Sequence, residues 1–165
     1  MAEQNIAVMI HTDSGIFSGT LSIPAGMRLS DFINLPAQFL QLKNVAVCGP
    51  SYNSDEIHVN KKAIKILSTP SNSNCNGITN EKKGYPFVQK KPVGTKIFMT
   101  DYEVSGNLHS TNDCTLSKLL EKDIQFLPCT DVTISHVSDN STWSATFSAL
   151  NLNNISVLQN INSPI

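Results

Sequence analysis

The sequence has few charged residues, a single arginine and no long apolar run. Charged residues make up 15% of its 165 residues, against about 25% in a typical soluble protein. The formal net charge is −1, which disfavours a general nucleic-acid binder because such proteins carry a strong basic surplus. No apolar segment approaches the roughly 18 residues that a membrane-spanning helix needs. We therefore expect a protein that does not act at a membrane.

Signals for export and for metal binding are also missing. The first residues, MAEQN, are polar and unlike a secretory signal, so we expect a cytoplasmic protein. The cysteines are Cys48, Cys75, Cys114 and Cys129. They form no C-x-x-C pair and have no histidine at ligand spacing, so no metal or cofactor is predicted. Two disulfides are compatible with this count, but we favour free thiols, with Cys48 and Cys129 buried and Cys75 exposed.

What the chain does contain is an internal repeat. Residues 15–47 align without a gap with residues 102–134, at an offset of 87. Nine of the 33 positions are identical, where chance would give about two. After a further shift of four residues, 59–67 match 150–158. This repetition predicts two copies of one structural unit.

The segment between the copies is rich in Ser, Asn, Gly, Pro and Lys and poor in large apolar residues, which is typical of a linker. We therefore divide the chain into a first repeat at 5–68, a linker at 69–93 and a second repeat at 94–160.

Each copy is predicted to be mainly β. Alternating apolar residues indicate strands, with Asp13-Ser14-Gly15 as the turn of the first hairpin. Gly19 and Gly106 interrupt strand patterns, which predicts sharp bending or close approach of a neighbouring backbone. Apolar residues at spacings of three and four, from Leu29 and from Leu116, indicate one short helix in each copy, with Thr115 as an N-cap.

The predicted fold is thus two tandem small five-stranded barrel-like repeats, each with a short helix between its second and third strands. A core of about 65 residues is marginal alone. We therefore expect the copies to be held together, either as two abutting barrels or as one continuous sheet.

The motif Arg28-Leu29-Ser30-Asp31-Phe32-Ile33-Asn34 resembles an RLSDFLN-type signature found in small β-barrel domains of uncharacterised bacterial proteins. The order of elements is similar to that of Sm-like barrels. The resemblance covers nearly all of the first copy, whereas the second copy lacks the Arg, Asp and Asn. It implies a fold and no established activity.

Candidate binding residues are few. Arg28 could clamp an anion, although pairing with Asp31 or a carbonyl is the simpler interpretation, and Asp31 suits the start of a helix. In the linker, Lys82 and Lys83 lie close to Tyr85 and Phe87, a mixture that can contact nucleic acid or an acidic partner. A solvated linker is the simpler interpretation there too.

Neither a catalytic set nor a phosphate-binding loop is present. The leading hypothesis is a non-enzymatic binding or assembly module, because small barrels leave sheet edges that a protein partner or a second subunit can cover. One alternative is an Sm-like protein that binds nucleic acid, which the low pI disfavours. The other is a small enzyme with a cleft between the copies, lined by residues such as His58, His109 or Cys114.

Overall fold

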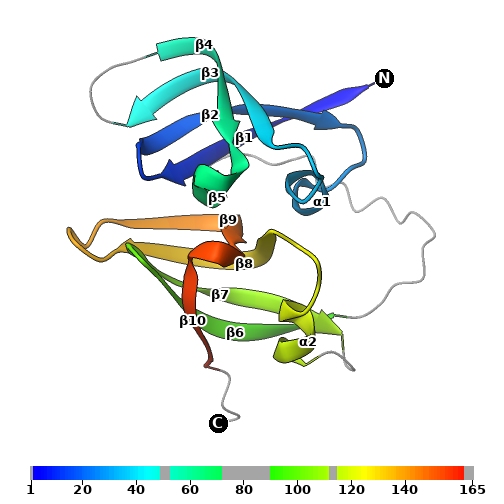
Figure 1. Ribbon diagram of the computed structural model, residues 1–165, viewed down its shortest axis with the longest axis vertical. Coiled ribbons are helices and arrows are strands. Elements are labelled where there is room, and N and C mark those ends of the chain that lie inside the picture. The colour runs from blue at the N-terminus through cyan, green and yellow to red at the C-terminus, as the bar shows by residue number, and fades with distance from the viewer. Residues whose placement is uncertain (1, 49–52, 72–89, 112–114, 162–165) are drawn as a thin grey trace.

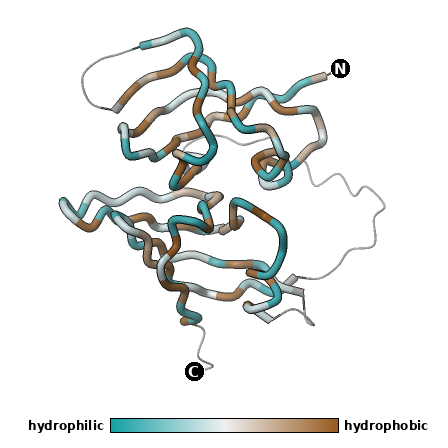
Figure 2. The backbone as a smooth tube through the Cα atoms, viewed as in Figure 1, coloured by the Kyte–Doolittle hydropathy of each residue, from teal (hydrophilic) through white to brown (hydrophobic). Residues whose placement is uncertain are grey.

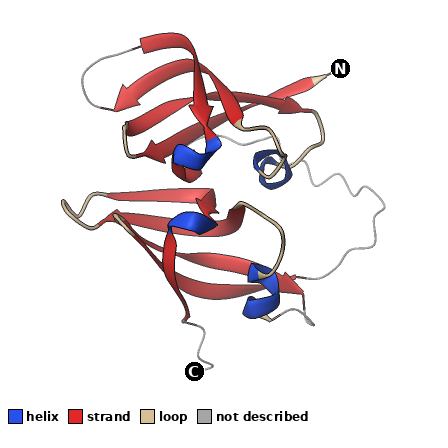
Figure 3. Cartoon of the chain, in the orientation of Figure 1, coloured by secondary structure: helices blue, strands red, loops and turns tan. Residues whose placement is uncertain are grey.

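The structure is a computed structural model that describes residues 2–48, 53–71, 90–111 and 115–161. Strands dominate it (Figure 3), which confirms the prediction of a mainly β protein. The first half contains β1 (Glu3–Thr12), β2 (Gly15–Pro24), α1 (Leu29–Ile33), β3 (Phe39–Cys48), β4 (Asn53–Asn60), the 3-10 turn η1 (Lys61–Ala63) and β5 (Ile64–Pro70). The second half contains β6 (Lys90–Met99), β7 (Tyr102–Thr111), α2 (Leu116–Leu120), β8 (Phe126–His136), β9 (Thr142–Asn151), η2 (Leu152–Asn154) and β10 (Ile155–Asn160).

The ten strands of the described residues belong to one open antiparallel sheet, in the order β10-β6-β7-β8-β9-β5-β1-β2-β3-β4. Each half has the same internal order, in which its last strand lies beside its first. The two halves lie one above the other in Figure 1, with β5 and β9 facing each other where they meet. Of the two arrangements left open by the sequence, the structure has the continuous sheet.

The junction between the halves is the pairing of β5 with β9. Its register includes Ile66 opposite Leu150 and Leu67 opposite Ala149. No pairing joins β4 to β5, or β9 to β10, among the described residues, so hydrogen bonding does not close either half on itself. The fifth strand of the first half is instead paired with the fourth strand of the second.

Local sequence signals account for the turns and caps. The turn of the first hairpin follows β1, where the Thr12 hydroxyl donates to the Gly15 carbonyl and accepts from the N–H of Ser14. Thr115 caps α2 as expected, because its hydroxyl accepts from the N–H of Lys118.

Gly19 and Gly106 permit the close approach that their sequence positions predicted. A Cβ atom on Gly19 would lie 2.7 Å from Leu42 Cγ and 2.8 Å from the Lys43 carbonyl oxygen. On Gly106 it would lie 2.6 Å from Cys129 Sγ. The strand register shifts at both glycines, so a bulge bends the sheet at the same place in each half.

Each half has its own hydrophobic core, and each core also includes residues from the opposite half. Phe126 and Ala149, from the second half, belong to the first core. Ile66, from the first half, belongs to the second core. Figure 2 shows hydrophobic segments of both halves facing each other where the halves meet. Packing as well as strand pairing therefore joins the two copies.

β5 ends at Pro70 and β6 begins at Lys90, so strands extend into both ends of the predicted linker. The rest of that linker, residues 72–89, lies outside the described residues. Within the described ranges no helix is long and apolar enough to span a membrane.

Candidate functional site

The structure places two of the candidate binding residues at the start of α1. Arg28 is the N-cap residue, and its side chain makes no capping hydrogen bond. Asp31 lies in the first turn. Both are exposed, and no ion pair within the described part of the chain joins them. The other four candidates, Lys82, Lys83, Tyr85 and Phe87, lie outside the described residues.

A residue of the same motif that sequence analysis gave no role, Asn34, connects the two halves. Its side-chain oxygen accepts from the N–H groups of Gln125 at 3.0 Å and Phe126 at 2.9 Å. Its amide nitrogen donates to the carbonyls of Phe126 at 3.0 Å and Ser30 at 2.9 Å. Asn34 thus ties the end of α1 to the start of β8, across the junction. The matching position in the second copy holds Glu121. This difference between the copies was the one sequence feature that set Asn34 apart.

An ion cluster closes the junction at another point. The Lys65 side chain, only 7% exposed, pairs with Asp13 at 2.6 Å and with Asp101 of the second half. Burial acts to lower the pKa of Lys65, but its hydrogen bonds to the two carboxylates outweigh burial, so the pKa is raised. The Lys65 hydrogen bond lowers the pKa of Asp101. The lysine therefore stays charged and holds both halves.

Next to this cluster lies an aromatic group from both halves that the sequence did not suggest. His11 is fully buried, and its Nδ1 atom is 3.2 Å from the Tyr102 hydroxyl. The His11 ring makes edge contacts with Tyr102 and Trp143, at centroid distances of 5.2 and 5.0 Å. Burial, with a smaller effect of His136, lowers the pKa of His11 to about 4. His11 and Tyr102 are not repeated at their matching positions, which hold Phe98 and Gly15, so the repeat did not reveal this group.

The two histidines proposed for a catalytic cleft lie on different strands, one in each half. His58 lies on β4, at one end of the sheet. His109 lies on β7 and is 2.6 Å from the Thr130 hydroxyl, while Cys114 lies outside the described residues. No group of three metal-binding side chains occurs in the ranges that the structure describes. Cys129 is buried as predicted, and burial raises the pKa of its thiol to about 12, so it is unreactive.

The two ends of the sheet are the features most suited to binding. β5, which is paired on both sides, has six of its seven residues buried. Its counterpart β10 ends the sheet and has none buried. At the opposite end, β4 has only Val59 buried, whereas the last four residues of its counterpart β9 are all buried.

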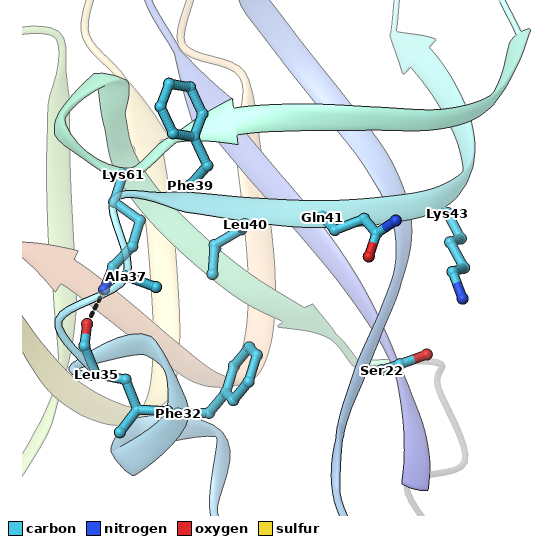
Figure 4. A pocket seen from close by; sticks show the side chains of 9 residues that line it. All are labelled: Ser22, Phe32, Leu35, Ala37, Phe39, Leu40, Gln41, Lys43 and Lys61. Carbon is cyan, nitrogen blue, oxygen red and sulfur yellow. Dashed lines mark hydrogen bonds between the residues drawn. The ribbon is translucent and has the colours of Figure 1, made fainter.

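A pocket lies near the β4 end of the sheet, lined mainly by β3, α1 and the segment between them (Figure 4). It is lined by Ser22, Phe32, Leu35, Ala37, Phe39, Leu40, Gln41, Lys43 and Lys61. Lys61 is buried and donates to the Leu35 carbonyl, and burial lowers its pKa. Phe39 points to the opposite side of β3 from Leu40 and is 51% exposed. The end of the first half therefore presents an aromatic anchor beside β4, which pairs with β3 on one side only among the described strands.

Comparisons of the chain with protein-family models, with curated proteins and with solved structures gave no match. The functional argument therefore rests on the geometry of the sheet.

Proposed function

We propose that this chain is a non-enzymatic assembly module, built from two tandem copies of an Sm-like unit, that binds proteins by strand pairing at β4 and β10. The observation that carries the proposal is the contrast between paired and terminal strands. The same structural position is buried in β5 and solvated in β10. A strand added there would satisfy edge N–H and C=O groups and cover apolar side chains.

The design of the junction supports this function. In β5–β9 pairing, the halves combine backbone hydrogen bonds with the exchange of core residues. The β5–β9 pairing supports the proposal, because it joins the strands that correspond to the two edges. The two edges lie at opposite ends of one sheet, so each can hold a partner without contact with the other.

The test compares the proteins retained from a lysate of the source cells by three forms of the full chain. The wild type and the control Val137→Asp keep both edges intact, since Val137 lies on the turn after β8. The double variant Phe39→Asp, Val157→Asp places a charge at both edges. We expect the first two to retain the same proteins and the third to lose them. Equal retention by all three, or no retained protein, contradicts the proposal.

A further inference from the structure

We infer that the partner of each edge is a second copy of this chain, with β4 of one molecule paired antiparallel to β10 of the next. This inference rests on the proposed function, because it assigns the occupant of the same two edges. It is argued from the internal junction, which shows how the fourth strand of one unit binds the fifth strand of another.

The two units correspond residue by residue, so the junction predicts a register for the contact between chains. Positions on β5 and β4 match those on β10 and β9 at an offset of 91. The internal pair Ile66 and Leu150 becomes Val157 and Val59, and the pair Leu67 and Ala149 becomes Leu158 and His58. In this alignment β4 of one molecule runs antiparallel to β10 of the next. β4 stays paired with β3, and β10 stays paired with β6.

Exposed hydrophobic residues lie at the positions that this contact would cover. Phe39 is 51% exposed, and its counterpart Phe126 is fully buried in the first core. Val157 is 54% exposed, whereas its counterpart Ile66 is fully buried. On α2, Leu120 is 39% exposed, and its counterpart Ile33 shares the first core with Phe126. Three apolar residues that the junction hides, Phe126, Ile66 and Ile33, thus have exposed counterparts in Phe39, Val157 and Leu120.

A polar contact is repeated as well. Asn151 is buried, and its side chain donates to the Ile64 carbonyl at 2.8 Å across the junction. Its counterpart Asn60 is exposed. Both residues accept a hydrogen bond from the N–H two positions later. In the contact between chains, Asn60 would donate to the Ile155 carbonyl of the neighbouring molecule.

The outer contact differs from the junction in its charges. The counterparts of Lys65, Asp13 and Asp101 are Ser156, Thr100 and Ser14, so the ion cluster is not repeated. Association between chains is therefore mainly apolar and reversible, and added salt should not weaken it. Because the two surfaces differ, the contact is heterologous, and it continues from chain to chain until a ring closes or a filament forms.

The experiment is sedimentation equilibrium on the purified full chain alone. We expect the wild type and the control Val137→Asp to associate, and Phe39→Asp and Val157→Asp each to be monomeric, because either carboxylate would be buried unpaired. An equimolar mixture of these two edge variants should form dimers and nothing larger, since each retains the edge that the other lacks. The milder variant Asn60→Asp keeps its turn contact with Lys62 but loses its donor, so association should weaken about tenfold.

Three results would overturn the inference. The first is a wild type that stays monomeric at the highest concentration that remains in solution. The second is that Phe39→Asp and Val157→Asp, each measured alone, associate as strongly as the wild type. The third is an edge variant that dimerises alone, which indicates a symmetric contact. A monomeric wild type whose edges still retain other proteins would overturn this inference and leave the proposed function standing.

Discussion

Asn34 holds the backbone of Phe126 through two hydrogen bonds, accepting from its N–H at 2.9 Å and donating to its carbonyl at 3.0 Å. The side chain of a helix-terminal residue in one half thus acts as a strand partner for the first residue of β8 in the other. This relationship fixes where Phe126 enters the first core.

Removing that side chain should destabilise the whole chain. Asn34→Ala leaves the N–H and C=O groups of a buried residue without their partners, so we expect the free energy of unfolding to fall by about 2 kcal/mol. The matched control is Glu121→Ala, the same position in the second half, which is exposed and should change it by less than about 0.5 kcal/mol. Urea unfolding measures both. Equal effects would show that Asn34 has no special role.

The Lys65 cluster should contribute at neutral pH and lose its effect in acid. Asp101→Asn weakens the pairing of a buried ammonium, and we expect a loss of about 1 kcal/mol, against no change for the exposed control Asp123→Asn. The lowered pKa of Asp101 means that its contribution is present above the ordinary carboxyl pKa of about 4 and lost as pH falls through the lowered pKa. Unfolding of both proteins at pH 7 and at several values below pH 4 checks this. A difference between wild type and variant that does not decrease as pH falls below 4 would contradict it.

His11 should make the protein less stable in mild acid. Its pKa is about 4 in the folded chain and about 6.5 when unfolded, so the unfolded chain binds a proton first as pH falls. The free energy of unfolding should therefore decrease between pH 6.5 and 4, by up to about 3 kcal/mol.

The variant His11→Phe, which introduces the residue found at the matching position 98, tests the assignment to this histidine. Its unfolding free energy should fall less steeply over the same pH range. The control is His58→Phe, which makes the same substitution at a histidine whose side chain is 61% exposed and leaves His11 in place. Identical pH profiles for wild type and His11→Phe would show that another group is responsible.

The two bulge glycines should differ in their tolerance of a methyl group. In Gly19→Ala the new Cβ meets the Lys43 backbone oxygen at 2.8 Å, whereas in Gly106→Ala the nearest atom is the Cys129 sulfur at 2.6 Å. Backbone yields less than a side chain, so we expect the first variant to be the more destabilised, by about 2 kcal/mol or more. Adding Cys129→Ala should restore part of the stability lost in Gly106→Ala and none of that lost in Gly19→Ala. Thermal unfolding of the four variants decides this.

Sequence patterns predicted much of the local structure because the interactions that determine it are local. The turn before Gly15, the cap at Thr115 and the close approach at Gly19 and Gly106 each follow from short-range chemistry. The repeat predicted that the two halves have the same elements. The barrel-like closure predicted for each copy is not confirmed, because the described strands form one open sheet.

The pairing of the halves was not predictable in the same way. Which edge strand meets which depends on contacts between residues far apart in the chain, such as the bond from Asn34 to Phe126. His11, Tyr102 and Trp143 were not predicted to form a group, because their contacts join the two halves and have no equivalent within either copy. The junction between the halves occurs once in the chain. The residues that form it therefore need not be repeated in both copies, and several differ from their counterparts.

Hydrogen–deuterium exchange measured at increasing protein concentration tests the central claim, that β4 and β10 are open copies of the paired strands β9 and β5. We predict that amides of β4 and β10 exchange fast in dilute solution and slow down as concentration rises, while those of β5 and β9 exchange slowly throughout. Exchange of β4 and β10 that does not change with concentration would contradict this account.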